Sequence, residues 1–340
     1  MIVRLEIWMK RLRYIDIAKG MAILCMVLGH TYSMQEKPFI FIWIYSFHMP
    51  LFFITSGILY RIKRSGEQKY SSLIQKKTKT LLIPYLIWNT IYQIFISILN
   101  FRGGKNIWLT NLQHIIYFNG SAMWFLPVMF IASLIFLVTI KNKYLNIILG
   151  ITLAIVGINM PECSYMLEVV FRAFVGVIFI EIGYYFYDMY INNFSKIILV
   201  IVIGLDILGV QKNGLVNLSD RLFNNPYIYI YIWTACLGTY IIYKLSIYLD
   251  KRNIRLLEYW GKNSIKILCL HGFIIEIIRL VDYKIFGNVL VCMGRWEGVV
   301  FTSIIMIILT SSMPLINKFL WWSFGERREN LRKIKQTEKI

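Results

Sequence analysis

Apolar runs of about twenty residues recur along the whole chain and limit its fold more than any other feature of the sequence. A helix needs roughly 20 mainly apolar residues to cross the hydrocarbon core of a bilayer. Runs of this kind lie near residues 15–33, 40–60, 80–99, 123–140, 144–160, 166–187, 195–210, 226–245, 264–281 and 298–320. Because 58% of the 340 residues are hydrophobic, a soluble domain of this size could not bury the apolar surface. We therefore predict an all-α integral membrane protein, a bundle of about ten transmembrane helices.

Lys and Arg are concentrated in alternate connecting segments, which predicts the orientation of the bundle. Cytoplasmic loops carry an excess of these residues. The basic set comprises the segments 4–13, 61–79, 141–143, 251–262 and 327–339. The other set holds only Lys37, Arg102, Lys105, Lys212, Arg221, Lys284 and Arg295. We predict that both termini are cytoplasmic, and that the net charge of +19 reflects this asymmetry rather than binding to nucleic acid.

The chain is expected to form one transmembrane domain at residues 1–325, followed by a charged cytoplasmic tail at residues 326–340. The basic N-terminus leads into an apolar run as in a signal peptide, but no small-residue cleavage pattern follows, so we expect an uncleaved first span. No repeat at a fixed period is visible, which weakens the case for a transporter built from repeats. The five cysteines are scattered without a CxxC pair, and no glycine-rich phosphate loop occurs. The sequence therefore indicates neither a zinc site, a disulfide framework nor a nucleotide-binding fold.

Ionisable side chains inside the first apolar run are the main candidates for function. A charge at the centre of a membrane helix costs about 2.5–3.5 kcal/mol on insertion scales, so such residues are rare and functional by default. A helix advances about 100° per residue, so Lys19 and His30 point the same way, with Asp16 one turn before Lys19. A solvated pair at the membrane edge would account for Asp16 and Lys19. His30 lies past the midplane, where it favours a general base or acyl carrier over a histidine that bonds across helices.

The second apolar run contains His48, in YSFHMPLFFITSG. Pro50 removes a backbone donor just past this histidine and should bend the helix. Ser56 lies among small and hydroxylated residues that suit close packing. A kinked span with a packing histidine explains this run as well as a direct role does. A further histidine, His271 in NSIKILCLHGF, is expected nearer the cytoplasm than His30.

Two further groups of residues have both a functional and an ordinary explanation. Lys76, Lys77 and Lys79 open the third run, in KKTKTLLIPYLIW, and could meet the phosphates of a soluble cofactor. The residue pattern alone favours ordinary cytoplasmic flanking charges. Trp124, in GSAMWFLP, is expected at the outer interface, either in an aromatic belt or at the border of a sugar-binding surface.

Paired charges are expected in the half of the membrane that holds His30. Glu168 and Arg172 are four residues apart, and Glu276 and Arg279 are three apart, so each pair can form within one helix. A polar path from a basic cytoplasmic mouth to His30 would suit transfer of a small activated group outward. It would equally suit transport of a polar solute, and the residues alone do not choose between these functions.

The stretch YIDIAKGMAILCMVLGH resembles the opening of the membrane-bound acyltransferase 3 family, most closely the branch that includes fucose 4-O-acetylase-like enzymes. The resemblance continues through FHMPLFFITSG, KKTKTLLIPYLIW, MWFLPVMF and NSIKILCLHGF, and so covers nearly the whole chain. It implies about ten spans and transfer of acyl groups, commonly acetyl, to sugar hydroxyls of surface polysaccharides. It also implies that His30 matches the essential histidine of the first span. Lys19 falls where many members have an arginine, which it replaces without the bidentate contacts.

We therefore predict an O-acetyltransferase of the cytoplasmic membrane that uses acetyl-CoA and no metal. Its acceptor would be a surface polysaccharide or a lipid-linked sugar precursor, and a homo-oligomer is compatible with this role. The residues expected to act are His30, Lys19 and His48 in catalysis, Asp16, Glu168, Arg172, Trp124 and Ser56 toward the substrate, and Lys76, Lys77 and Lys79 toward acetyl-CoA. The alternatives are a transporter or flippase for a glycolipid precursor, and a non-catalytic scaffold of a polysaccharide-assembly complex.

Overall fold

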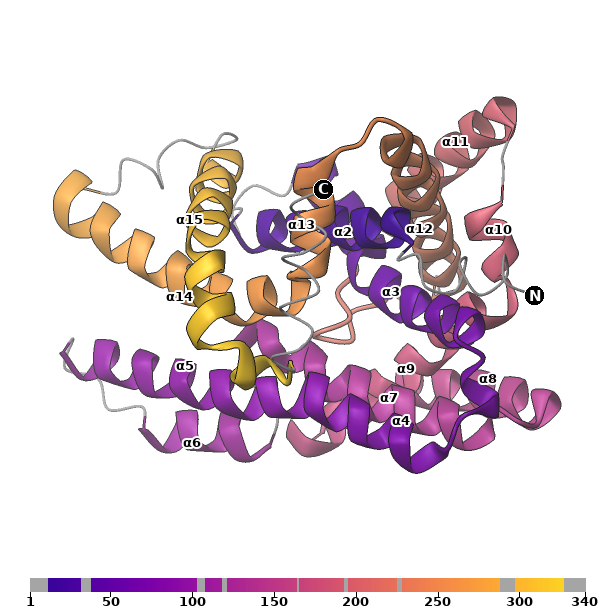
Figure 1. Ribbon diagram of the computed structural model, residues 1–340, viewed down its shortest axis with the longest axis horizontal. Coiled ribbons are helices and arrows are strands. Elements are labelled where there is room, and N and C mark those ends of the chain that lie inside the picture. Colours follow the sequence, from indigo (N-terminus) through magenta and orange to yellow (C-terminus); the bar gives the residue numbers. More distant parts are fainter. Residues whose placement is uncertain are drawn as a thin grey trace.

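The computed structural model describes residues 12–31, 38–102, 108–117, 121–163, 165–192, 195–224, 228–287 and 297–326, and these are almost entirely helical (Figure 1). The α-helices are α2 (Arg13–Thr31), α3 (Phe39–Ile62), α4 (Tyr70–Lys77), α5 (Ile83–Arg102), α6 (Trp108–Ile116), α7 (Phe125–Thr139), α8 (Lys143–Asn159), α9 (Tyr165–Tyr185), α10 (Tyr187–Ile191), α11 (Lys196–Asn213), α12 (Ile228–Lys251), α13 (Arg255–Lys262), α14 (Ser264–Val281) and α15 (Glu297–Phe319). Short 3₁₀ and π turns are η1 (Ser65–Glu67), η2 (Thr78–Leu82), η3 (Ser121–Trp124), η4 (Asp282–Phe286) and η6 (Trp321–Phe324). The prediction of an all-α fold is confirmed over these ranges.

Every predicted apolar run coincides with a helix, but the helices differ in their fitness to cross a membrane. Five stretches in the described ranges are long and apolar enough, namely α2, α3, the continuous 70–100 stretch through α4 and α5, α12, and α15. Helices α7 and α8 are apolar but have only 15 and 17 residues. Helices α9, α11 and α14 are longer, but each contains three charged residues. The chain is a multi-pass membrane protein, whereas the count of ten spans and the orientation stay predictions.

Several of the sequence predictions concern segments outside the described residues. These are the N-terminal segment 1–11, nearly all of the predicted cytoplasmic tail, and the basic residues Lys37, Lys105 and Arg295.

Helix α2 lies in the middle of the bundle, between α12 on one side and α14 and α15 on the other (Figure 1). It packs against α3, α12, α13, α14 and α15. Most of its apolar side chains are buried, among them Ile17, Ala18, Ala22 and Val27. The helix that carries Asp16, Lys19 and His30 is therefore held on most of its circumference by protein.

Helices α2 and α3 are each in direct backbone contact with a neighbouring helix through glycine. A Cβ atom on Gly20 of α2 would overlap the carbonyl oxygen of Leu257 in α13, and one on Gly261 would overlap that of Asp16. Helices α3 and α9 meet in the same way. Small residues allow this close approach between membrane helices, and the resulting van der Waals contact holds the helices together. Both histidine-bearing helices, α2 and α3, are thereby fixed to a neighbour.

Candidate active site

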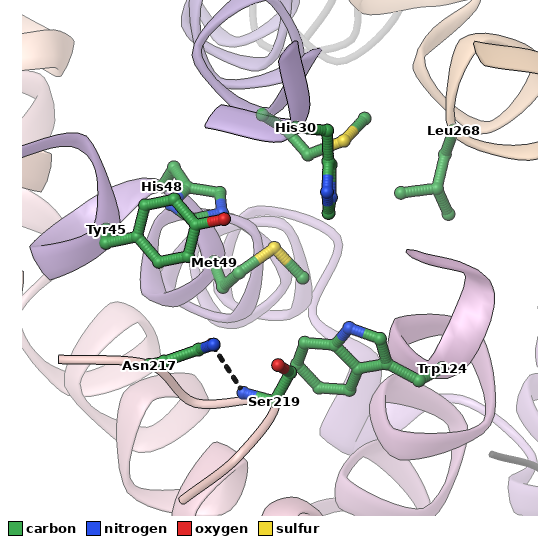
Figure 2. Close-up of a pocket in the computed structure, with 9 residues that line it drawn as sticks. His30, Tyr45, His48, Met49, Trp124, Asn217, Ser219 and Leu268 are labelled. Atoms are coloured by element: carbon green, nitrogen blue, oxygen red, sulfur yellow. Dashed lines mark hydrogen bonds between the residues drawn. The ribbon is translucent and has the colours of Figure 1, made fainter. Parts of the chain in front are cut away.

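A cavity at the end of α2 brings together two of the histidines singled out from the sequence (Figure 2). Its lining residues are Met26, His30, Tyr45, His48, Met49, Trp124, Asn217, Ser219 and Leu268. They come from α2, α3, η3 and α14, and from the segment 214–224, which we call the α11–α12 loop. The space between them holds about 330 Å³ without atoms, part of it open to the surroundings.

His30 occupies the last turn of α2 and points into the cavity from above in Figure 2. Its side chain is partly buried, and among the described residues it makes no side-chain hydrogen bond. Its ring instead lies 5.3 Å from the ring of His271, centroid to centroid. The C-terminal end of a helix carries a partial negative charge that favours a cation. A histidine in this position has ring nitrogens available to take a proton.

His48 and His271 are both tied to their own helices. The Nδ1 atom of His48 lies 2.8 Å from the carbonyl oxygen of Ile44, and that of His271 lies 2.9 Å from the carbonyl oxygen of Leu268. Because a carbonyl oxygen only accepts, Nδ1 carries the hydrogen in each ring, and Nε2 is the acceptor of the neutral form. Both side chains are buried, at 6% and 1% exposed. The hydrogen bonds fix the orientation of both rings. A ring held in this way can border the site of His30 without turning.

The position of His271 differs from the sequence expectation. We expected it nearer the cytoplasm than His30, because residue counts place it about 10 Å from one end of its span. The structure brings the two rings into contact. Counting residues along one helix gives a depth only relative to that helix, and it does not show where two helices lie relative to each other.

Tyr45 lies beside His48 and lines the same cavity, and the sequence did not point to it. Its hydroxyl donates to the carbonyl oxygen of Gly29 at 3.4 Å, and its ring lies 5.1 Å from the ring of His48. A Cβ atom on Gly29 would lie 2.9 Å from the Tyr45 ring, so glycine before His30 makes room for this contact. In the sequence, Gly29 beside His30 was the one feature that could have indicated a large side chain packed at this point.

Trp124 is buried rather than exposed at an interface. Its side chain is 8% exposed and forms one wall of the cavity, below His30 in Figure 2. The guanidinium carbon of Arg172 lies 5.5 Å from the centre of its ring, within the range of a cation–π contact. A buried cavity wall is not the position of a lipid-facing aromatic belt, and a role of Trp124 toward the substrate stays a prediction.

The predicted ion pair between Glu168 and Arg172 is not formed. Glu168 instead pairs with Arg221 of the α11–α12 loop, with Arg221 Nη2 at 2.6 Å from Oε1 and Arg221 Nε at 2.7 Å from Oε2. A bidentate arginine fork is stronger than a single contact one helical turn away. These bonds raise the pKa of Arg221 above its ordinary value. Neighbour rules along one helix could not find a partner 53 residues away.

The other two predicted pairs are present but lie outside the cavity. Lys19 Nζ is 2.7 Å from Asp16 Oδ1, and Asp16 is buried. This pair lies about 16 Å along α2 from His30, so neither residue lines the cavity. Arg279 Nη1 is 3.6 Å from Glu276 Oε1, and both side chains are substantially exposed.

The remaining candidates lie apart from the cavity. Ser56 donates to the sulfur of Met129 at 3.6 Å, so it faces α7. Lys77 Nζ lies 4.8 Å from the centre of the Tyr60 ring. Lys76 is exposed and Lys79 partly buried, and neither is among the lining residues. Within the described ranges no cluster of three or more His, Cys, Asp or Glu side chains could hold a metal ion.

The comparisons with known proteins identify the family of the chain. No curated protein and no solved structure matches the chain. A family model described as an acyltransferase domain, that of acyltransferase 3, matches residues 12–315. This range runs from α2 into α15 and includes all four histidines of the chain. The protein is therefore a multi-pass membrane acyltransferase that belongs to the acyltransferase 3 family.

Proposed function

We propose that this protein is an O-acetyltransferase of the cytoplasmic membrane. It would move an acetyl group from cytoplasmic acetyl-CoA to a hydroxyl of a surface polysaccharide or of its lipid-linked precursor. The observation that carries this proposal is the cavity in which His30 and His48 face Trp124 and two neutral polar side chains, Asn217 and Ser219. A proton acceptor beside an aromatic wall and uncharged hydrogen-bonding groups suits a sugar hydroxyl. Membership of the acyltransferase 3 family supports the transfer of an acyl group.

In the proposed reaction, His30 takes the proton of the acceptor hydroxyl while the hydroxyl oxygen attacks the thioester carbonyl. The carbon–sulfur bond then breaks, and the thiolate of CoA leaves and takes up the proton. Transfer by way of an acetyl group on His30 is a second route with the same net result. In both routes His48 and His271, whose rings are fixed by backbone carbonyls, border or hold His30.

The donor is proposed to bind at the basic cytoplasmic side, where Lys76 and Lys79 would contact phosphates of acetyl-CoA. Replacing both with glutamine is expected to raise the KM for acetyl-CoA at least about tenfold, because a hydrogen bond to a charged group contributes about 1.5–3 kcal/mol. The kcat should change little, because these residues lie outside the histidine cavity. Steady-state kinetics in membrane vesicles measures both constants.

The exposed Lys141 offers a matched control for this experiment. Lys141→Gln removes a charge from another segment predicted to be cytoplasmic and should leave the KM for acetyl-CoA unchanged. An equal rise in KM for the control would show that Lys76 and Lys79 act only through the overall positive charge of that membrane face and do not contact the donor.

The proposed function is tested by the O-acetyl content of surface polysaccharide, measured by proton NMR before and after mild alkali. A deletion strain should lose alkali-labile acetyl signals, and the wild-type gene should restore them. Vesicles that contain the protein should also transfer label from radioactive acetyl-CoA to the polysaccharide of the deletion strain. Polysaccharide flux across vesicles without any acetyl-CoA requirement would instead support a transporter and refute the acetyltransferase.

A further inference from the structure

The α11–α12 loop is a small, closed hairpin rather than an open connection. Its base is closed by the Asn224 side chain, which donates to the carbonyl oxygens of Asn213 at 2.5 Å and Leu215 at 2.8 Å. Two backbone hydrogen bonds of 2.8 and 2.9 Å join Asn217 and Leu222. This hairpin brings polar side chains to a cavity whose other lining residues belong to helices.

Side chains alternate along the first arm of the hairpin. Val216 and Leu218 are buried, at 0% and 3% exposed, whereas Asn217 and Ser219 line the cavity opposite His30 (Figure 2). The two polar residues are held by each other and by Asp220. The Ser219 backbone amide donates to Asn217 Oδ1 at 3.0 Å, and Asn217 Nδ2 donates to Asp220 Oδ2 at 2.6 Å.

These bonds leave hydrogen-bonding capacity for a ligand. Ser219 Oγ donates to Asp220 Oδ1 at 2.9 Å, which leaves both of its lone pairs as acceptors. One amide hydrogen of Asn217 is likewise not used in these bonds. The lining residues of the cavity include no Lys or Arg. A neutral compound with several hydroxyls fits this lining better than a phosphate or a carboxylate does.

Arg221 anchors the hairpin to the neighbouring helices with all five of its N–H donors. Besides the two bonds to Glu168, Nη1 donates to the carbonyl oxygens of Gly157 at 3.1 Å and Met160 at 2.7 Å, and Nη2 donates to that of Pro161 at 2.9 Å. Its guanidinium thus joins the C-terminal end of α8 to Glu168 in the first turn of α9. A positive charge is favourable at the C-terminus of a helix, and a negative charge is favourable at the N-terminus. The φ angle of Arg221 is +49°, a conformation that residues other than glycine seldom adopt.

We propose that the α11–α12 loop is the acceptor-binding element of the site, with Asn217 and Ser219 as the acceptor-binding side chains and Arg221 as the positioning residue that fixes them opposite His30. This inference rests on the proposed acetyl transfer at His30. Among the residues that the structure describes, Asn217 and Ser219 are the Asn, Gln, Ser or Thr side chains that line the cavity, so the loop supplies the contacts that select the acceptor.

The acceptor-binding part is tested with Asn217→Ala and Ser219→Ala in vesicles. The acceptor probe is de-O-acetylated polysaccharide from the deletion strain. Each variant should raise the KM for this acceptor about three- to tenfold, the value of one neutral hydrogen bond, and leave the KM for acetyl-CoA unchanged. A KM split of this kind is not expected from a general loss of stability. An unchanged acceptor KM in both variants would overturn the assignment.

The anchoring part is tested without reference to activity, by the rate at which diethyl pyrocarbonate modifies His30, read by mass spectrometry of purified protein. Arg221→Met should release the loop and raise this rate severalfold, and Arg221→Lys should raise it less, because lysine keeps the charge but loses the fork. Arg252→Met is the matched control, since Arg252 is exposed just past the C-terminal end of α12 and its guanidinium contacts Tyr248. Equal rates in Arg221→Met and Arg252→Met would overturn the anchoring role.

The kinetic measurement and the His30 modification rate distinguish failure of the proposed function from failure of the anchoring role. If wild-type vesicles transfer no acetyl group to the polysaccharide, the proposed function and the acceptor assignment are both refuted. The His30 modification rates still decide in that case whether Arg221 holds the loop over the cavity.

Discussion

His30→Gln lowers kcat for acetyl transfer at least about 100-fold in the outcome we expect, because a positioned general base contributes about 10²–10⁴-fold. Glutamine keeps polar atoms at the site but cannot take the proton. His30 is the cavity histidine without a side-chain hydrogen bond to any other described residue, and it stands at the end of α2. The KM for acetyl-CoA should change little. Initial rates with labelled acetyl-CoA in vesicles of matched protein content measure the effect.

The other histidines provide the comparison. His48→Gln should lower kcat roughly tenfold, which corresponds to about one hydrogen bond. The ring of His48 is oriented by the carbonyl of Ile44 and borders the same cavity. His114→Gln, on α6 and away from the cavity, should behave as wild type. A His30→Gln protein with wild-type kcat would show that His30 is a packing residue and that the catalytic assignment is wrong.

Gly183→Ala is the second substitution with a large expected effect, on folding rather than on chemistry. A Cβ atom on Gly183 of α9 would overlap the carbonyl oxygen of Ile54 in α3, and one on Gly57 would overlap that of Ile180. Overpacking costs about 1–3 kcal/mol when side chains adjust, and here the opposing atom belongs to a helix backbone, so the cost lies at or above that range. We expect a lower melting temperature and less folded protein in detergent, measured by fluorescence-detected size exclusion after heating.

Gly204→Ala on α11 is a close control for this effect. Nothing lies within 4 Å of the Cβ atom it would add. Alanine in the middle of a helix is favoured over glycine by about 0.5–1 kcal/mol, so this variant should melt at or above the wild-type temperature. Equal melting of the two variants would show that α3 and α9 are not in the backbone contact described.

Much of the fold follows from local sequence patterns, because apolar runs of helix length have few other structures available in a bilayer. The Asp16–Lys19 pair was predictable for the same reason, since helix geometry alone places the two side chains together. The spacing of His30 from Lys19 indicated a polar face on α2. It could not show that His48 borders the same cavity, because that depends on how α2 packs against α3.

The parts of the site that the sequence did not predict all come from contacts between distant segments. Arg221 looked like one of a few scattered charges in connecting segments, and its partner Glu168 was expected to pair within α9. Asn217 and Ser219 lie in a connecting segment whose position is set by that ion pair. Trp124 follows a short polar segment that resembles an interface, and only the packing around it shows that it is enclosed.

The glycine contacts that fix α2 to α13 and α3 to α9 also bear on how substrates reach the site. A mechanism of alternating access requires one group of helices to rock against another around a central site. The two helices that carry the cavity histidines are each joined to a neighbour by backbone touching backbone, so such rocking would have to carry the neighbours along or separate those contacts. In the proposed reaction the histidine-bearing helices would therefore keep their places, and the donor and the acceptor would travel to them.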